Sequence, residues 1–427
     1  MQRRTFLTLG GVSMAGACSG WAGEGWGEES SFSGETLTEA SRQIPIVRQA
    51  DVVVCGGGPA GVAAALSAAR QGKRTVLLES AGCLGGIWTT GALCLLLDYH
   101  NKTGIMREIV ERLEQLQAKR GDCYDIESMK YLLDTLCAEA GVEVQLYTQV
   151  VSVVKDVENR VRAVITESKS GREAVCGKVF IDCTGDGDIG ALAGCGFDFG
   201  HPEDGRFMPM SLMALLTGLN HEEMKPFYDY KNLLAEMERA GIQPSYRRPS
   251  LWFLNEQVWG LMATHQHQLR GTDARDLTTA TIRARAELHE MVTKLRNSGG
   301  VWKNLRLVST AGKIGVREGR RIHGEYTVTE KDLWEGRKHE DAACRVTYNI
   351  DIHVSRPITS GTSAHLQKVP PYDIPIRALI AKDVKGLMMA GRCVSGDFHA
   401  HASYRVTGNA VAMGEAAGKF AAENIKK

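Results

Sequence analysis

The stretch Asp51-Val52-Val53-Val54-Cys55-Gly56-Gly57-Gly58-Pro59-Ala60-Gly61 decides the fold of this 427-residue chain. The nearly all-apolar run 50–55 predicts a buried parallel strand. The Ala-rich run 59–71 has a proline at its start and Gly72 after its end, which are the signals of a helix. Residues 74–79 predict a second strand, so the whole segment is typical of one βαβ unit.

The three spaced glycines of this turn each meet a different requirement of a dinucleotide. Gly56 permits the tight turn, Gly58 lets the backbone approach a pyrophosphate, and Gly61 lets the helix pack against the sheet. The helix N-terminus then offers free N–H groups to the phosphates. Glu79 ends the second strand, where a carboxylate accepts hydrogen bonds from ribose hydroxyls and disfavours the extra phosphate of NADP. The alternative, a glycine-rich turn without a ligand, is disfavoured by this context.

Bulk composition excludes several other classes of protein. The chain has 51 basic and 50 acidic side chains, so nucleic acid is not an expected partner. No apolar run approaches the roughly 20 residues of a membrane span. The 11 cysteines contain no Cys-x-x-Cys pair, so we expect neither a zinc site nor a ferredoxin-type cluster, and no metal.

The first residues are typical of an export signal. Residues 3–7, Arg-Arg-Thr-Phe-Leu, precede a short apolar run without acidic residues, and this arrangement resembles a twin-arginine (Tat) signal. We expect a signal peptide over residues 1–18 and a flexible linker over 19–47, which is rich in Gly, Glu and Ser. A disordered basic terminus is the alternative.

Cys18 leaves two processing routes open. Ala15 and Ala17 satisfy the small-residue rule for cleavage before Cys18, and the same stretch resembles a weak lipobox with Cys18 as the lipidated residue. The mature protein is therefore expected to be periplasmic or lipid-anchored. A lipid at Cys18 is the one contact with a membrane that we expect.

Patterns along the rest of the chain predict an α/β fold with two domains. Residues 48–200 and 373–427 form a discontinuous Rossmann-like domain, a parallel sheet with helices and a β-hairpin insertion. Residues 201–372 form an inserted α+β substrate or cap domain. Within the insertion, residues 201–300 have a helical pattern in places, for example at 220–227 and 278–295. Residues 340–372 are strand-like and interrupted by prolines.

Four further segments resemble a known family. They are Gly82–Gly86, Ile181–Asp188, Leu387–Arg392 and Gly408–Gly418. Together with the Gly56 turn, they resemble the FAD-dependent oxidoreductases whose flavin domain is shared with the flavin-carrying polypeptide of heterodisulfide reductase, and more distantly the fumarate reductase flavoproteins. The resemblance implies FAD as the cofactor. This chain lacks the cysteine runs that carry iron–sulfur clusters in that heterodisulfide reductase polypeptide.

The resemblance also implies which residues contact FAD. The pyrophosphate would lie on the Gly56 turn, and the AMP ribose on Glu79. The ribitol would lie by Gly85 and Gly86, and Val151 or its neighbour Val150 would contact adenine through the backbone. The complete set is Gly56, Gly58, Pro59, Ala60, Gly61, Glu79, Gly85, Gly86, Val151, Thr184, Gly185, Asp186, Arg392, Gly408, Asn409 and Ala410.

The C-terminal segment Asp397–Arg405 carries the densest group of polar residues next to the expected flavin site. We predict His401 as a base or hydrogen-bond partner of the substrate and Arg405 as the clamp for an anion or oxyanion. His399 is the second choice for the base. Histidines that only pack against the flavin are the alternative.

Two other segments resemble the substrate side of the family. Arg317 and Arg321 would lie on one face if their segment were helical. They would either grip a substrate carboxylate or pair with Glu318 and Glu325 in a structural network, and the structural role is slightly favoured. His353 is more often a core histidine than a base.

These observations predict an exported FAD-dependent oxidoreductase. It would take a hydride from a small organic substrate, a sugar or a hydroxy acid, to FAD and pass the electrons to an unidentified acceptor. The alternative is a flavin-binding electron-transfer module without a small-molecule substrate of its own. Trp252, Phe253 and Trp259 would stack on a sugar ring if they faced the substrate, although core packing is the more frequent role of such residues.

Overall fold

A computed structural model of the protein describes residues 31–33, 36–353 and 364–425. The chain divides into two units, Met1–Pro45 and Ile46–Lys427. In the first, strands β1 (Ser31–Ser33) and β2 (Thr36–Thr38) form an antiparallel pair. The predicted signal peptide 1–18 and Cys18 lie outside the described residues.

A seven-stranded sheet forms the centre of the second unit. Its order is β7-β4-β3-β10-β9-β8, and β21 also pairs with β10. The strands β7, β4, β3, β10 and β21 run parallel, and β9 and β8 are antiparallel additions, as the predicted hairpin requires. The bounds are β3 Ile46–Cys55, β4 Thr75–Leu78, β7 Glu143–Gln145, β8 Gln149–Lys155, β9 Val161–Ser168, β10 Gly171–Asp182 and β21 Leu387–Met389. The predicted α/β class with a Rossmann-like sheet is confirmed.

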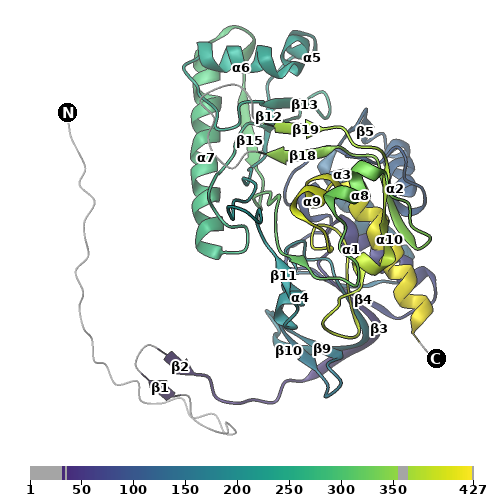
Figure 1. Ribbon diagram of the computed structural model, residues 1–427. Coiled ribbons are helices and arrows are strands. Elements are labelled where there is room, and N and C mark those ends of the chain that lie inside the picture. The colour runs from purple at the N-terminus through teal and green to yellow at the C-terminus, as the bar shows by residue number, and fades with distance from the viewer. Residues whose placement is uncertain (1–30, 34–35, 354–363, 426–427) are drawn as a thin grey trace, which may run out of the picture. The chain divides into compact units, whose positions relative to one another are not determined.

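Helices pack beside this sheet because their sequences are rich in small or amphipathic residues. The bounds are α1 Pro59–Arg70, α2 Gly104–Gln115, α3 Ile126–Glu139, α4 Asp188–Leu192 and α10 Thr407–Asn424. Helices α1 and α10 lie against each other, although more than 300 residues separate them in the chain. In Figure 1 the yellow C-terminal helix lies beside the purple N-terminal one.

Glycines make the contact between α1 and α10 very close. A Cβ on Gly414 would lie 2.1 Å from the carbonyl oxygen of Ala60, and one on Gly418 would lie 2.2 Å from that of Ala64. Small residues on both helices therefore let the two backbones touch.

The inserted segment contains a second, antiparallel sheet with the order β13-β14-β12-β15. The helical character expected for 201–300 was therefore wrong in part, because this segment also contains strands. Three strands of only four residues each lie there, too short for a two-residue period to stand out. The bounds are β12 Ala214–Thr217, β13 Ser250–Phe253, β14 Trp259–Met262, β15 Arg306–Thr310, α5 His221–Met224, α6 Tyr230–Arg239 and α7 Ala274–Asn297. The helices predicted at 220–227 and 278–295 correspond to α5 with the 3₁₀ turn η2 (Lys225–Tyr228), and to α7.

Short elements connect the insertion to the central domain. The strand character predicted for 340–372 is confirmed, and β17 of this segment packs on α10. The bounds are β11 Phe197–Asp198, β16 Arg321–Ile322, α8 Glu330–Glu335, β17 Ala342–Val346, β18 Ile350–His353, β19 Ala364–Gln367, β20 Tyr372–Pro375 and α9 Phe398–Tyr404. Two-residue strands β5 (Lys119–Arg120) and β6 (Cys123–Tyr124) and the 3₁₀ turns η1 (Gly86–Trp88), η3 (Gly300–Trp302) and η4 (Ile376–Leu379) complete the described elements. The domain boundaries at 200 and 373 stay a prediction, because residues 46–427 form one compact unit.

The parallel strands determine where a site forms. The chain leaves the carboxyl ends of β3, β4, β10 and β21 at Cys55, Leu78, Asp182 and Met389. These ends lie at one edge of the sheet because the strands are parallel and adjacent. Ligands of open parallel sheets bind at this edge. None of the described helices has the length and hydropathy needed to cross a membrane.

The α1–α10 contact predicts how much one added methyl group on α10 lowers the free energy of unfolding. Gly418→Ala places a Cβ in contact with a backbone carbonyl of α1, so we expect a loss of about 1–3 kcal/mol in the free energy of unfolding. Chemical denaturation measures it. Lys419→Ala, at an exposed position of the same helix, is the control, and equal stability of the two variants would contradict this packing.

The raised pKa of Asp182 predicts that the free energy of unfolding falls as the pH rises toward about 6. Its carboxyl is fully buried at the end of β10 and accepts hydrogen bonds from Thr184 and from the Gly190 amide, but burial raises its pKa to about 6. In the unfolded chain it ionises near pH 4, whereas the folded state keeps the proton to about pH 6. Its stabilising contribution is therefore complete below about pH 4 and falls by about 3 kcal/mol as the pH rises to about 6.

Unfolding free energies of the wild type and Asp182→Asn, measured from pH 4.5 to 7, test this. The variant cannot ionise at this position, so the difference between the two proteins should shrink as the pH rises. A difference that does not change with pH would show that Asp182 ionises normally.

Candidate active site

One cavity of about 790 Å³ lies at the carboxyl edge of the central sheet. At one end it is lined by the Gly56 turn and Glu79, and at the other by residues of the insertion such as Tyr246 and Trp252. The two ends are parts of one space.

The glycine turn has the geometry of a nucleotide cradle. Gly56 has a φ of +100°, and a Cβ there would lie 2.5 Å from the carbonyl oxygen of Cys183. A Cβ on Gly61 would lie 1.7 Å from the oxygen of Gly56, so Gly61 provides helix packing as predicted. A Cβ on Gly58, in contrast, would meet no atom within 4 Å and would project into open space at the wall of the cavity. Gly58 is thus needed by a ligand rather than by the fold.

Glu79 is fixed in place before any ligand arrives. Its Oε2 accepts a hydrogen bond from the Gly57 amide at 2.6 Å, and its Oε1 accepts one from the Ala81 amide at 2.7 Å. The side chain is buried and lines the cavity. Each oxygen keeps lone-pair capacity for a hydroxyl donor, as a ribose would supply.

Two helix N-termini reach the cavity without a capping side chain. The cap of α1 is Gly58 and that of α10 is Val406, and Pro59, Thr407 and Ala410 also line the wall. The Thr407 hydroxyl is buried and has no hydrogen-bond partner among the described residues. Uncapped N-termini carry partial positive charge and free N–H groups, which suit a diphosphate and the electron-rich edge of a flavin.

A loop after β10 closes the cradle. Asp182 holds Thr184 and Gly190 by hydrogen bonds, and Arg392 after β21 forms an ion pair with Asp186 at 2.9 Å. The glycine cradle, the fixed Glu79 carboxylate and the two uncapped helices fit FAD.

Most of the predicted FAD residues lie on the wall of the cavity. They are Gly56, Gly58, Pro59, Ala60, Glu79, Gly86, Thr184, Gly185, Asp186, Arg392 and Ala410. The others, Gly61, Gly85, Val151, Gly408 and Asn409, do not line it. Val150 lines the wall in place of Val151, and Gly408 packs against the backbone of Leu97 and Asp98.

The predicted histidines lie elsewhere. His401 is wholly buried in α9, and neither ring nitrogen has a hydrogen-bond partner among the described residues. Burial and three nearby arginines hold its pKa well below the usual value. His399 lies 3.4 Å from Glu330. Neither ring lines the cavity, and a catalytic role for them stays a prediction without support from this geometry.

Arg405 does line the cavity, in a cluster with Asp351 and His353 of β18. Its Nη2 donates to the backbone oxygen of Asp351 at 2.9 Å and to Oδ2 at 3.2 Å. The same Oδ2 lies 3.1 Å from His353 Nε2. Burial lowers the pKa of His353 to about 4, so the ring is neutral near pH 7. The imidazole, Arg405 and Arg317 hold the pKa of Asp351 far below its usual value.

Arg317 and Arg321 have different roles, because their segment is not helical. Arg321 forms a buried ion pair with Glu318 at 2.8 Å, the predicted structural network. Arg317 lines the cavity, and its Nη1 donates to Pro209 O and to Ser211 Oγ, both at 2.8 Å. Among the described residues it has no ion pair. Burial lowers its pKa to about 10.

Aromatic side chains complete the far end. Tyr246, Tyr348 and Trp252 line the cavity. Phe253 and Trp259 do not, and their rings pack on each other at 4.8 Å. Sequence reasoning missed Tyr246 and Tyr348, because no motif marks them and only the fold brings them to the wall.

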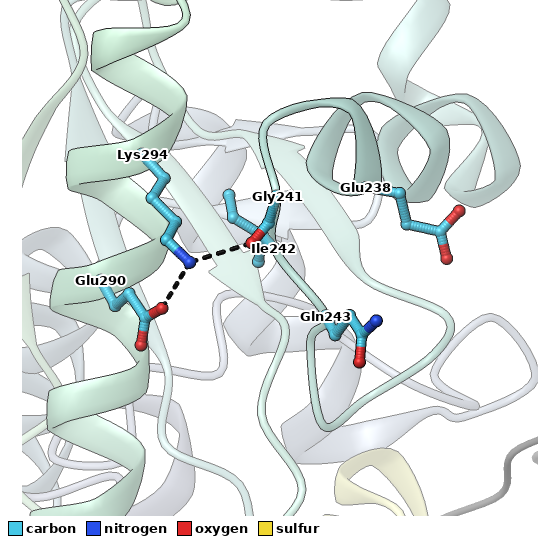
Figure 2. Close-up of a pocket in the computed structure, with 6 residues that line it drawn as sticks. All are labelled: Glu238, Gly241, Ile242, Gln243, Glu290 and Lys294. Atoms are coloured by element: carbon cyan, nitrogen blue, oxygen red, sulfur yellow. Dashed lines mark hydrogen bonds and ion pairs between the residues drawn. The ribbon is translucent and has the colours of Figure 1, made fainter.

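A second hollow lies between α6 and α7, away from these residues (Figure 2). Lys294 there pairs with Glu290 and donates to the Gly241 carbonyl, so its charge is compensated within the hollow. In the part of the chain that the structure describes, no three His, Cys, Asp or Glu side chains are grouped to hold a metal ion.

Short segments of the chain are similar to curated proteins. One is 42% identical over 74 residues to urocanate reductase of Eggerthella lenta, covering 17% of this chain and 12% of that protein. Another is 51% identical over 45 residues to dihydrolipoyl dehydrogenase of Trypanosoma brucei brucei, covering 10% and 9%. The matches thus span about a tenth of the length of these relatives.

Among solved structures, a geranylgeranyl bacteriochlorophyll reductase-like protein from Thermoplasma acidophilum is 15% identical with a TM-score of 0.45. The alignment covers 88% of this chain and 77% of that one. The profile of the FAD dependent oxidoreductase family matches residues 51–427, from the Gly56 turn to the C-terminal residue. The chain therefore belongs to the FAD-dependent oxidoreductase family.

Proposed function

We propose that this FAD-dependent oxidoreductase is a dehydrogenase that takes a hydride from a small organic substrate of the sugar or hydroxy acid class. The observation that carries the proposal is the shared cavity, which joins the FAD cradle to a chamber walled by the insertion. A protein that only relays electrons has no use for such a chamber. The chamber favours the dehydrogenase over the electron-transfer module.

The chain's own residues prepare the chamber for this chemistry. FAD, when bound, accepts the hydride. Tyr246, Trp252 and Met262 from the insertion line the far end and limit the room for water. Asp351 holds the His353 ring by one nitrogen, and Arg317 and Arg405 supply positive charge nearby. These groups orient a polar substrate and receive its proton.

We also propose that the protein is exported by its Tat-type signal. It would then be periplasmic or anchored through a lipid on Cys18, and would pass its electrons to an acceptor outside the cytoplasm. Cell fractionation tests this. Replacing Arg3 and Arg4 by lysine should retain the protein in the cytoplasm, and unchanged export would contradict the Tat route.

Reduction of the bound flavin tests the dehydrogenase. Sugars and hydroxy acids are mixed anaerobically with the purified protein, and we expect at least one to bleach the absorbance at about 450 nm. Trp252→Ala enlarges the chamber and should change the concentration at half-maximal reduction, whereas Trp334→Ala, on the exposed surface, should not. If a redox protein reduces the flavin and no small molecule does, the electron-transfer module is correct.

The open space beside Gly58 on the cavity wall predicts that a larger residue at this position leaves the fold intact and weakens FAD binding. Gly58→Val points its side chain into open space, so the apoprotein should keep its thermal unfolding midpoint. Because the side chain occupies the place of the pyrophosphate, FAD affinity should fall at least about tenfold, or about 1.4 kcal/mol. Flavin absorbance relative to protein measures it. Gly312→Ala, where an added Cβ lies 3.8 Å from the Thr90 oxygen, is the matched control and should keep FAD.

A further inference from the structure

Arg317 is a buried cation on the cavity wall that has no ion-pair partner among the described residues. The nearby Asp351 carboxylate acts on it only from a distance, because Arg405 and His353 already bond to that carboxylate. Its nearest partners are the neutral oxygens of Pro209 and Ser211 and the Met262 sulfur, at 3.7 Å from Nη2. No described Asp or Glu forms an ion pair with it, although burial already costs it enough to lower its pKa. A guanidinium has five N–H donors in a planar fork that matches a carboxylate. Arg317 therefore has hydrogen-bond donors left for a planar anion in the cavity.

Arg405 is less suited than Arg317 to bind a substrate carboxylate, because it already bonds to Asp351. Its Nη2 already donates to the Asp351 carboxylate and backbone, while Nε, in a side chain 90% buried, has no partner among the described residues. Arg405 is a positioning residue, because it fixes the carboxylate that in turn fixes His353. This differs from the role of anion clamp expected from the sequence, which the geometry gives to Arg317.

His353 has the free nitrogen that a proton acceptor needs. Its side chain is 8% exposed and lines the cavity, and its Nδ1 is buried and has no hydrogen-bond partner among the described residues, so a substrate reaches this nitrogen only if the ring or its neighbours shift slightly. With Asp351 ionised, the proton of the neutral ring lies on Nε2 and donates to Oδ2. Nδ1 then carries the lone pair. The Tyr246 and His265 rings, 5.9 Å and 5.1 Å away between centroids, pack beside it and keep the ring in place.

We propose that the substrate is a 2-hydroxy carboxylate, held by Arg317 through its carboxylate and deprotonated at its hydroxyl by His353 Nδ1. The inference rests on the proposed dehydrogenase and names its substrate class. A neutral sugar would leave Arg317 without an ion-pair partner in the chamber.

The reaction balances within one turnover. The C2–H bond breaks and its electron pair leaves with the hydrogen as a hydride, which FAD would accept when bound, while the hydroxyl proton moves to His353 Nδ1. The C2–O bond becomes a carbonyl, and the product is a 2-oxo carboxylate. The substrate loses two electrons and FAD gains them.

Oxalate binding tests the carboxylate site without turnover. Oxalate is a planar anion that cannot be oxidised by hydride loss, and its neutral isostere oxamide is the comparison. We expect oxalate to perturb the flavin spectrum of the holoenzyme and oxamide not to. Arg317→Met should weaken oxalate binding at least about 30-fold, the effect of losing a charge-assisted hydrogen-bonded pair. Arg306→Met, at an exposed arginine of β15, should leave it unchanged. Equal binding of oxalate and oxamide, or intact oxalate binding by Arg317→Met, overturns the site.

Anaerobic reduction by glycolate, lactate and mandelate, compared with their amides, tests the chemistry. We expect the acids and not the amides to bleach the flavin. His353→Gln should slow bleaching at least about 100-fold and leave oxalate binding in place, as loss of a general base does. If His353→Gln reduces FAD at the wild-type rate, His353 is not the base.

The pH profile separates a base from a structural histidine. His353 faces the cations Arg317 and Arg405 and the carboxylate of Asp351, with Tyr246 and His265 beside it. The wild-type rate should stay flat near neutral pH and fall toward about pH 4 as the ring takes a proton. The Asp351 carboxylate raises the pKa of His353. Asp351→Asn should therefore move this fall to lower pH, and an unmoved profile contradicts the pairing.

The dehydrogenase activity and the 2-hydroxy carboxylate substrate are contradicted by different results. If oxalate binds through Arg317 but no 2-hydroxy acid bleaches the flavin, the dehydrogenase is wrong and the carboxylate site stands. If sugars bleach the flavin and oxalate does not bind, the dehydrogenase stands and the 2-hydroxy carboxylate is wrong.

Discussion

The contact between α1 and α10 is the constraint on which the site depends. Gly414 and Gly418 let α10 lie directly on the carbonyl groups of α1. Two helices from opposite ends of the chain thereby direct uncapped N-termini to the same cavity. Their partial positive charges cost nothing to reorient when an anionic cofactor arrives, because the helices are already fixed. A larger residue at either glycine would separate the helices and move one of these ends away from the cofactor.

The substrate end is built on a different principle, since it depends on charges brought together by loops and short strands. Asp351, His353 and Arg405 form one hydrogen-bonded row, whereas Arg317 faces the chamber from another segment without an acidic partner among the described residues. The charges of Asp351 and Arg405 pair with each other, whereas Arg317 has no ion-pair partner among the described residues. This difference between two arginines of one cavity is the reason to assign one to positioning and the other to the ligand.

The places of the Gly56 turn, Glu79 and most of the other predicted FAD residues on the cavity wall were predictable, because each directly follows a strand or begins a helix in a local pattern. Other predicted residues do not line the cavity, and this has physical causes as well. Gly408 packs on the backbone of Leu97 and Asp98, and the Asn409 side chain accepts a hydrogen bond from Cys344, although the flanking Thr407 and Ala410 line the cavity. His401 is buried because every residue of α9 except His399 is buried, which the polar composition of the segment did not indicate. The strands of the insertion are too short to show a period.

The sequence by itself determined the βαβ unit, the FAD cradle and the α/β class, because strand, glycine turn and helix are adjacent in the chain and interact locally. The tertiary structure alone decided that Arg317, His353 and Tyr246 share one chamber and that His401 does not. These residues lie on segments separated by tens of residues, and their proximity is set by the packing of the insertion onto the central sheet. Spacing along a chain carries no information about such contacts, because they depend on how distant segments pack.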